Sequence, residues 1–217
     1  MSVAAPPDPE SMVDAEGFQR LTGATPAQMA DLEAYRLLLE DWNSRMNLVG
    51  PKSMDHYWDR HAWDSAQLLT LAPEAKTWAD LGSGAGLPGV ILAIFFKGRE
   101  GHHVHLVESM AKRCRFLTEV VTQLALPATV HHARAEQVSL SVDIVTARAC
   151  APLSRLMGYG RPYLKRGAEA LFLKGQDVAS ELEDATRYWG FEADVLPSQS
   201  DARGRIVRVR KLLRGKV

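Results

Sequence analysis

Hydrophobic residues in the first third of the chain recur at helical spacing. The segment Thr25-Pro26-Ala27-Gln28 has the residues of a capping box, with proline at the first helical position. After it, apolar residues follow in alternating steps of three and four, which places them on one helix face. These residues are Leu32, Tyr35, Leu39, Trp42 and Met46. We predict a helix that ends near Asn47 and a second one over about 53–71.

From residue 76 onward, short apolar runs alternate with longer amphipathic or apolar segments. The runs predicted as strands are 77–81, 104–107, 129–132, 144–146, 170–173, 191–196 and 205–210. The segments predicted as helices are 88–96, 112–124, 151–163 and 178–189. Strands that alternate with helices indicate βαβ crossovers and an α/β fold with a mainly parallel, doubly wound sheet. Only a polar loop, 197–204, separates the last two strands, so we expect a hairpin with one antiparallel strand.

This pattern predicts three parts of the chain. Residues 1–9 are rich in proline and are expected to be a disordered tail, residues 10–72 form an N-terminal helical section, and residues 73–217 form the α/β domain. With 217 residues, 46% of them hydrophobic, the chain can bury a core without disulfides. Its two cysteines, Cys114 and Cys150, are expected to be small buried hydrophobes. No signal peptide or membrane-spanning run is evident, so a cytoplasmic protein is expected.

Charge is balanced over the whole chain but unevenly distributed. Residues 1–44 hold eight acids against two arginines, whereas residues 203–217 hold seven basic residues and no acid. Such a basic run can contact RNA phosphates, although a solvated strand and tail would have the same composition. The candidate phosphate contacts are Arg208, Arg210 and Lys211.

Candidate chemistry is concentrated after the first predicted strand, in the segment Asp80-Leu81-Gly82-Ser83-Gly84-Ala85-Gly86-Leu87-Pro88-Gly89. Glycines at such a strand-to-helix turn permit positive φ angles and let a ligand approach the backbone. One register, 84–89, matches the G-x-G-x-x-G fingerprint of dinucleotide sites. That match leaves an NAD-dependent oxidoreductase as an alternative.

The other register combines Asp80 with the alternating glycines Gly82, Gly84 and Gly86, and it resembles motif I of class I S-adenosylmethionine-dependent methyltransferases. That cofactor has no phosphate and carries positive charge, so an acid at the strand end is useful. Glu108 ends the second strand, where a carboxylate can accept hydrogen bonds from ribose hydroxyls, or instead cap the next helix. This register therefore predicts a Rossmann-like methyltransferase domain.

Further segments resemble the ribosomal RNA small subunit methyltransferase G family, also called the glucose-inhibited division protein B family. They are Gly86-Leu87-Pro88-Gly89, Trp42-Asn43 with Met46-Asn47-Leu48, Arg60-His61-Ala62-Trp63-Asp64-Ser65, the run from Glu108 to Leu117, the run from Asp143 to Ala149, and Leu173-Lys174-Gly175. The resemblance implies a class I fold with a mostly parallel seven-stranded sheet. It also implies methyl transfer from S-adenosylmethionine to N7 of one guanine in 16S rRNA.

Carried over by motif, the resemblance implies cofactor contacts at Gly82, Leu87, Ala135, Glu136 and Arg148. N7 has a free lone pair, so no general base and no metal are expected. We assign Arg148 and Lys174 as candidate catalytic residues, with Lys174 contacting RNA or capping its strand. His61, which shares a helix face with Asp64 and Ser65, is a further candidate RNA contact. The resemblance implies an rRNA substrate, free or in a small-subunit particle. A non-catalytic RNA-binding protein is the remaining alternative.

Overall fold

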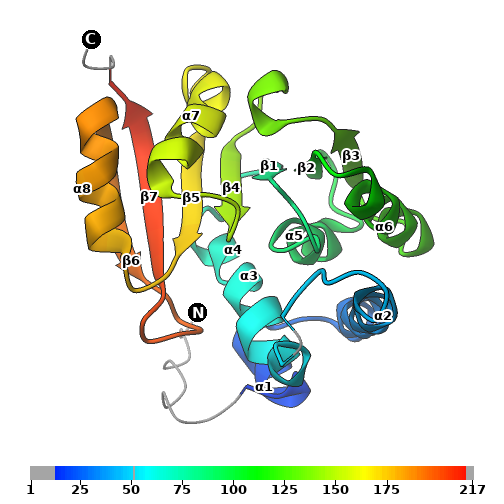
Figure 1. Cartoon of the computed structure of the whole chain (residues 1–217). Coiled ribbons are helices and arrows are strands. Elements are labelled where there is room, and N and C mark those ends of the chain that lie inside the picture. Colours follow the sequence, from blue (N-terminus) through cyan, green and yellow to red (C-terminus); the bar gives the residue numbers. More distant parts are fainter. Residues whose placement is uncertain (1–12, 51, 214–217) are drawn as a thin grey trace.

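A computed structural model describes residues 13–50 and 52–213 of the chain. It contains a seven-stranded sheet in the order β3-β2-β1-β4-β5-β7-β6. The strands are β1 (Thr77–Leu81), β2 (His103–Glu108), β3 (Ala128–His132), β4 (Ile144–Arg148), β5 (Glu169–Lys174), β6 (Phe191–Pro197) and β7 (Arg205–Leu212). The first five are parallel, and β7 is antiparallel to both neighbours. The predicted α/β fold and terminal hairpin are confirmed (Figure 1).

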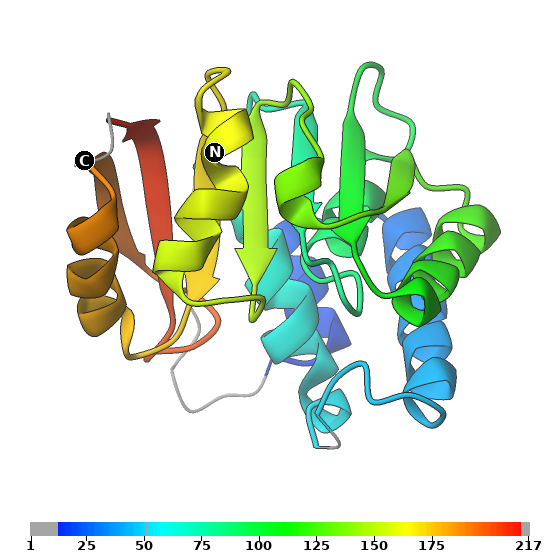
Figure 2. The same ribbon diagram turned by 45° about the horizontal axis from the view of Figure 1, so that its top comes forward.

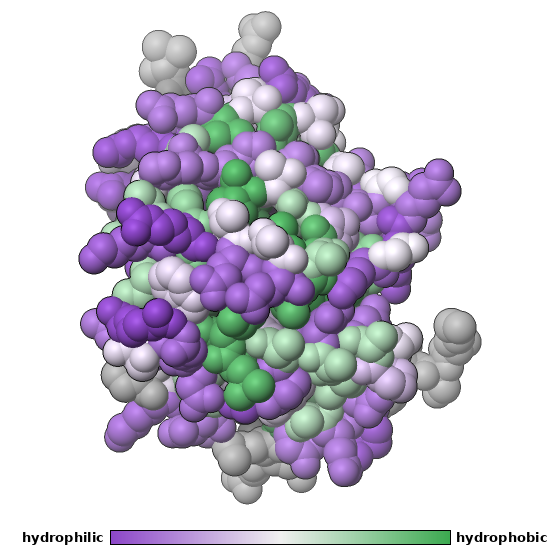
Figure 3. Space-filling model, turned by 90° about the vertical axis from the view of Figure 1, so that its right-hand side faces the viewer, coloured by the Kyte–Doolittle hydropathy of each residue, from purple (hydrophilic) through white to green (hydrophobic). Residues whose placement is uncertain are grey.

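Helices cover both faces of the sheet. The sheet helices are α5 (Gly89–Phe96), α6 (Ala111–Gln123), α7 (Leu153–Leu164) and α8 (Val178–Tyr188), with a short 3-10 turn, η3 (Ala135–Gln137). The buried side chains of α5 and α6 join one hydrophobic cluster, whereas those of α7 and α8 join a second one. Figure 3 shows the side that carries α2 and α6, where hydrophobic residues are interspersed among hydrophilic ones.

The N-terminal helices pack onto the same face as α5. They are α1 (Ala15–Thr22), α2 (Pro26–Asn43), η1 (Met54–His56), η2 (Tyr57–Trp63), α3 (Asp64–Ala66) and α4 (Leu68–Leu71). Phe18, Leu32 and Leu39 are fully buried in one cluster with Val90 and Ile94 of α5. The division at residue 72 stays a prediction, and the predicted tail at 1–9 lies outside the described residues.

The capping box predicted for α2 is present. Gln28 N donates to Thr25 Oγ1 over 3.2 Å, and Thr25 N donates to Gln28 Oε1 over 2.9 Å. The helix ends at Asn43 and not near Asn47, because the Asn43 side chain accepts the backbone N–H groups of Leu48 (2.7 Å) and Val49 (2.9 Å). The sequence analysis did not identify α1, although Asp14 caps its start and Gly23 its end.

The second predicted helix is present as the consecutive segments η1, η2, α3 and α4, and its centre is a π-helix. A π-helix has more residues per turn than an α-helix. Its last residues lie beside the carboxyl end of β4, as the cyan segment beside the β4 arrow in Figure 2 shows. Residues far apart in the sequence therefore meet at the edge of the sheet where ligands bind in open α/β folds.

Candidate functional site

The glycine loop, residues 82–88, leaves β1 at the point where the strand order reverses between β1 and β4. Gly82, Gly84 and Gly86 have φ angles of 68°, 56° and 87°, a region that residues with a Cβ rarely adopt. A Cβ at Gly82 would collide with Cys150, and one at Gly86 would collide with Val90. At Gly84 a Cβ would meet only the Gly82 carbonyl at 3.6 Å and Arg113 Nη1 at 3.9 Å, which are ordinary contacts, so of the three glycines only this one has room beside its backbone.

Two buried carboxylates bind the backbone of this loop and of the residue that follows it. Asp80, which is fully buried in β1, accepts a hydrogen bond at Oδ2 from Gly89 N over 3.1 Å. Glu108, 3% exposed at the end of β2, accepts at Oε2 from Gly84 N over 2.9 Å. Its Oε1 accepts from Met110 N over 2.8 Å, at the start of α6. Glu108 thus shapes the loop and also caps the chain that enters α6.

Asp80 has an unusual electrostatic environment. Burial raises the pKa of Asp80 to about 7, against hydrogen bonds from Gly89 and Ser83 that lower it. Its Oδ1 is buried and has no hydrogen-bond partner among the described residues. A buried carboxylate that lacks one partner is suited to a ligand that brings a cation or an N–H group.

The start of α5 disfavours the dinucleotide alternative. In dinucleotide sites the free N–H groups at a helix N-terminus bind the pyrophosphate anion. Here the N–H of Gly89, the first residue of α5, is already bonded to the Asp80 carboxylate. Leu106 and Asp80 also fill the space in which a Cβ of Gly89 would lie. The helix start is therefore closed by an acid that would repel a pyrophosphate when ionised.

The remaining predicted cofactor residues lie near the same edge. Ala133 N donates to the Glu108 carbonyl over 3.0 Å, which brings the segment after β3 beside the end of β2. Ala135 is half-buried and Glu136 is exposed in η3, which follows this segment. Leu87, with its side chain 4% exposed, packs into the core from the glycine loop. The cofactor roles of these residues stay predictions.

Arg148, at the end of β4, binds the N-terminal helical section. Its Nη1 donates to the Arg60 carbonyl over 2.7 Å and to Asp64 Oδ2 over 3.1 Å. Its Nη2 donates to Nδ1 of His61 over 3.1 Å. Ser65, expected on the same face, instead donates to the His61 carbonyl over 2.6 Å and is fully buried. At this turn His61 and Asp64 therefore contact Arg148, whereas Ser65 bonds within its own helix.

The contact with Arg148 also determines the state of His61. Nδ1 lies 3.1 Å from Arg148 Nη2, which can only donate, and 3.1 Å from the Arg60 carbonyl, which can only accept, so either neutral tautomer has a partner at this nitrogen. Burial and the nearby Arg148 charge lower the pKa of His61 to about 3, so the ring is neutral at physiological pH. The Nε2 atom is buried and has no hydrogen-bond partner among the described residues.

Lys174, at the end of β5, is mostly buried and has strong partners. Its Nζ lies 2.6 Å from Glu181 Oε2 and donates to the Ala151 carbonyl over 3.1 Å. Glu181 also accepts from Leu153 N, the first residue of α7, over 2.7 Å. In this structure Lys174 therefore ties the chain before α7 to α8, as the strand-capping alternative requires. Its contact with RNA stays a prediction.

A cavity of about 360 Å³ lies between the ends of β4, β5 and β7 and the helical section. Its lining includes Arg60, His61 and Asp64 from η2 and α3, Arg148, Lys174, and Arg205 at the start of β7. Arg60 is exposed, and among the described residues Arg205 donates only to the backbone carbonyls of Ala202 and Gly204. The sequence analysis did not single out Arg60 or Arg205 as RNA contacts, although Arg205 lies in the basic C-terminal run.

The predicted phosphate contacts of β7 lie farther from this cavity. β7 is antiparallel to β5, so Arg205 pairs with Lys174 at the ligand edge, whereas Arg208 pairs with Leu171 farther along the strand. Arg208 Nε donates to Glu169 over 2.7 Å, and Arg210 lies 2.5 Å from Asp194. Lys211 is exposed. The RNA roles of Arg208, Arg210 and Lys211 stay predictions.

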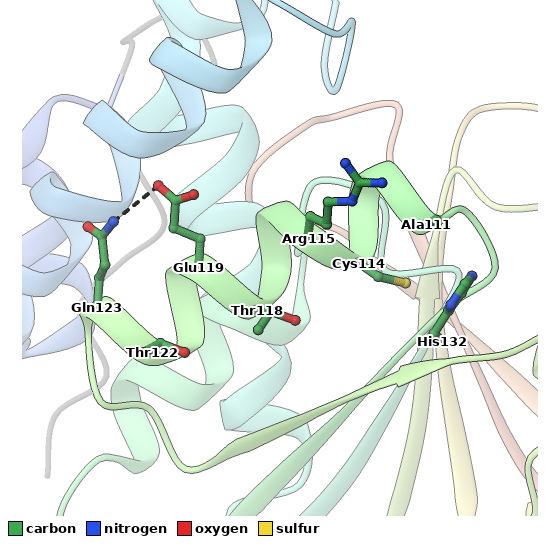
Figure 4. Close-up of a pocket in the computed structure, with 8 residues that line it drawn as sticks. All are labelled: Ala111, Cys114, Arg115, Thr118, Glu119, Thr122, Gln123 and His132. Carbon is green, nitrogen blue, oxygen red and sulfur yellow. Dashed lines mark hydrogen bonds between the residues drawn. The ribbon is translucent and has the colours of Figure 1, made fainter.

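A larger hollow, about 540 Å³, follows the outer side of α6 (Figure 4). Its lining residues are Ala111, Cys114, Arg115, Thr118, Glu119, Thr122, Gln123 and His132. The lining holds one arginine and one glutamate, and none of the glycine-loop residues. The hollow therefore lacks the polar groups that converge at the glycine loop.

Cys114 is buried, as expected, but the expectation for Cys150 is wrong, because it is exposed in the turn after β4. No helix among the described residues is long and apolar enough to cross a lipid bilayer. Within residues 13–50 and 52–213, no group of three or more His, Cys, Asp or Glu side chains is placed to bind a metal ion.

Tyr35 of α2 is a further site residue, one that the sequence patterns did not identify as such. Its hydroxyl donates to the carbonyl of Ala85, in the glycine loop, over 2.5 Å, and the side chain is fully buried. Tyr35 belongs to the predicted apolar stripe, so its spacing predicted burial but could not identify the partner. Through this bond the N-terminal helical section supports the loop directly.

The family model and similar curated proteins point to the same family. The family described as rRNA small subunit methyltransferase G matches residues 28–203. A "Ribosomal RNA small subunit methyltransferase G" from Caulobacter vibrioides (strain NA1000 / CB15N) is 61% identical over 206 residues, 95% of each chain. The protein of the same name from Caulobacter sp. (strain K31) is 64% identical over 92% of this chain and 90% of that one.

Solved structures with a similar fold are more distant. A SAM-dependent methyltransferase from Aquifex aeolicus has a TM-score of 0.54 at 16% identity, over 80% of this chain and 97% of that one. A mutant of MtNAS in complex with S-adenosylmethionine has a TM-score of 0.57 at 16% identity, over 94% and 86% of the two chains. At this identity the similarity concerns the fold alone.

The bond between Tyr35 and the glycine loop predicts a specific loss of ligand affinity. Tyr35→Phe should weaken binding of S-adenosylmethionine, the ligand that the loop motif predicts, about threefold to tenfold, since a buried hydrogen bond contributes about 0.5–1.5 kcal/mol. Tyr57→Phe is the matched control, because the buried Tyr57 hydroxyl donates to Leu32, away from the loop. Calorimetry on both variants measures the difference, and equal affinities would contradict it.

The raised pKa of Asp80, about 7, predicts a pH dependence of ligand binding. A cationic ligand binds the ionised carboxylate, so affinity should fall as pH decreases below about 7, approaching tenfold per pH unit. Asp80→Asn should abolish this part of the dependence between pH 5.5 and 8, because the amide does not titrate there. A parent protein whose dissociation constant follows the same pH curve as the variant would refute the assignment.

Proposed function

The chain belongs to the rRNA small subunit methyltransferase G family, and we propose that it transfers a methyl group from S-adenosylmethionine to N7 of a guanine in 16S rRNA. The observation that carries this proposal is the family match over residues 28–203, which includes the glycine loop and both carboxylates that hold it. The chain is an S-adenosylmethionine-dependent rRNA methyltransferase. The identification of the methylated atom as guanine N7 rests on the family resemblance, and the experiment below tests it.

The residues at the glycine loop fit this cofactor. When bound, S-adenosylmethionine supplies a methyl group on a positively charged sulfur. The room beside the Gly84 backbone can accommodate a ligand, and we assign the backbone of Gly82, Gly86 and Leu87 to the same wall. Asp80 Oδ1 lacks a partner that a cationic group would supply. Each Glu108 oxygen accepts one backbone N–H and has lone-pair capacity left for a ribose hydroxyl.

The adenine is assigned to the segment after β3, beside Ala135 and Glu136. This segment is joined to the end of β2 by the bond from Ala133 to Glu108. An acid that binds ribose and a neighbouring segment that reads the base edge would then be adjacent in space. Glu136 is exposed, so its side chain is free to turn toward a ligand without breaking a buried contact.

Methyl transfer to guanine N7 requires the protein mainly to position the two reactants. N7 has an in-plane lone pair and no proton, so it can attack the methyl carbon directly in an SN2 displacement. A general base is not needed, which suits a site whose histidine, His61, is neutral and held by Arg148. The contribution of the chain is to hold the base in line with the methyl group.

The charges at the site fit the product of this reaction. The methylated base gains positive charge, which an unpaired cation beside the ring would oppose. Arg148 is paired with Asp64 at 3.1 Å, and Lys174 with Glu181 at 2.6 Å. We assign Arg148 and Lys174 to the wall of the guanine pocket, where their remaining N–H donors can reach O6 or a phosphate. We assign the unpartnered Nε2 of His61, whose residue lines the cavity, as a further polar contact for the base.

RNA phosphates are assigned first to Arg60 and Arg205, whose side chains line the cavity of about 360 Å³. Arg208, Arg210 and Lys211 would extend this contact along β7. The substrate is rRNA, either free or assembled in a small-subunit particle, and the enzyme acts in the cytoplasm. No metal enters the mechanism, because N7 is already nucleophilic.

Mapping of N7-methylguanine in 16S rRNA by chemical cleavage tests the proposal. Incubation of unmodified rRNA, free or in small-subunit particles, with the protein and S-adenosylmethionine should create one new N7-methylguanine. Gly84→Val is the inactive control, because a branched side chain at a φ of 56° is strained and occupies the open side of the loop. A protein that binds the cofactor and RNA but methylates no guanine N7 would support the non-catalytic alternative.

The cavity predicts which arginines contact RNA. Arg205→Glu should weaken RNA binding and reduce the slope of log affinity against log salt by about 0.7–0.9 per lost phosphate contact. Cofactor affinity should not change, because Arg205 does not contact the glycine loop. Filter binding at several salt concentrations compares this variant with the triple Arg208→Glu, Arg210→Glu, Lys211→Glu. An altered slope in the triple variant alone would move the RNA track to the far part of β7.

A further inference from the structure

The loop between β6 and β7 is held by side chains of the N-terminal helical section. Gln67 Oε1 accepts from Gln199 N over 2.8 Å, and the two hydrogens of Gln67 Nε2 are shared among the hydroxyls of Ser198 (3.1 Å) and Ser200 (3.2 Å) and the carbonyl and Oδ1 of Asp64. Trp63 Nε1 donates to the Gln199 carbonyl over 3.2 Å. Both backbone groups of one loop residue are therefore bonded to a segment more than 130 positions earlier in the sequence.

Asp64 joins this loop to Arg148. Its Oδ1 accepts from Ser200 Oγ over 2.7 Å and from Gln67 Nε2 over 3.1 Å. Its Oδ2 accepts from Arg148 Nη1 over 3.1 Å. A single carboxylate thus fixes the loop on one side and the arginine of β4 on the other. We call Asp64, Gln67, Ser198 and Ser200 the loop brace.

The brace connects two walls of the same cavity. Ser198 and Ser200 line it from the β6–β7 loop and Arg205 from the start of β7, whereas Arg148 lines it from β4. Gln67 is 1% exposed and is not among the lining residues, so it cannot touch a ligand in the cavity. None of the hydrogen bonds of the brace reaches the glycine loop or its two carboxylates. Its effect should therefore fall on the ligand of the cavity and not on the cofactor.

We propose that Gln67 and Asp64 are positioning residues for the RNA substrate, which act by holding the β6–β7 loop and Arg148 at a fixed separation. The proposal rests on the proposed function, because it takes the cavity as the RNA site. A wall that is already ordered binds its ligand without the cost of ordering, and a displaced wall loses both affinity and alignment. The brace would thereby determine how well the base enters the cavity.

Gln67→Met tests this role, because methionine keeps the length of the side chain and removes all of its hydrogen bonds. The expected result is a KM for RNA raised about tenfold, with the dissociation constant for S-adenosylmethionine changed less than about twofold. Gln123→Met is the matched control, since Gln123 lies on the outer side of α6 and bonds only to Glu119 among the described residues. An unchanged KM in a folded Gln67→Met protein would overturn the proposal, and so would an equal loss of cofactor affinity.

Ser200→Ala provides a milder variant that removes one hydroxyl from the loop surface. It should raise the KM for RNA about threefold, and the double variant with Gln67→Met should be no worse than Gln67→Met alone, because both act through the same loop. Fully additive effects of the two substitutions would contradict a shared brace. In the double variant Gln67→Asn/Ser200→Ala, the amide side chain is one methylene shorter and is not expected to bond to Gln199. The KM for RNA should therefore stay above that of the parent protein, and a KM equal to the parent value would also contradict the brace.

A readout without RNA separates this proposal from the proposed function. The Gln199 amide is protected by Gln67 Oε1, so hydrogen exchange of the loop should accelerate at least tenfold in Gln67→Met and stay unchanged in Gln123→Met. Faster exchange with no change in KM would refute the positioning role while the loop contact stands. Absence of N7 methylation by the parent protein would refute the proposed function, whatever the exchange rates.

Discussion

The structure of the site depends on two buried carboxylates that bind the backbone of one loop. Asp80 on β1 bonds to Gly89, and Glu108 on β2 bonds to Gly84 and Met110. Burial of a carboxylate is costly unless hydrogen bonds compensate it, and the backbone N–H groups of Gly84, Gly89 and Met110 provide these bonds. The same bonds set the start of α5, the entry into α6 and the open side of the loop. The acids that shape the glycine loop are therefore also the acids that we propose as cofactor contacts.

The N-terminal helical section completes the site from outside the sheet. Tyr35 bonds to the glycine loop, Arg148 bonds to Asp64 and His61, and Gln67 bonds to the β6–β7 loop. These contacts place the section across the carboxyl ends of the central strands, beside the cavity assigned to RNA. The helices are thus one wall of the site, and their packing on α5 fixes that wall relative to the cofactor loop.

Local sequence patterns were sufficient for the fold and for the glycine loop. The strands, the hairpin and the capping box of α2 follow from spacing and turn chemistry. Asp80 and the three glycines form one local motif, and Glu108 ends a strand. Long-range partners had no such signal. Glu169 binds Arg208 from 39 positions away, and Gln67 reaches Ser198 across 131 positions. The early end of α2 and the π-helix η2 likewise depend on contacts that helical periodicity does not encode.

The central claim is that Glu108 prepares the glycine loop for S-adenosylmethionine and then binds it. Titration calorimetry of Glu108→Gln measures the affinity for S-adenosylmethionine directly. Glutamine keeps the shape of the side chain, but its N–H group would face another hydrogen-bond donor, either a backbone N–H group or a ribose hydroxyl. The account predicts affinity reduced about tenfold to a hundredfold, in line with 1.5–3 kcal/mol for a hydrogen bond to a charged group. An affinity equal to that of the parent protein, in a variant of equal stability, would contradict it.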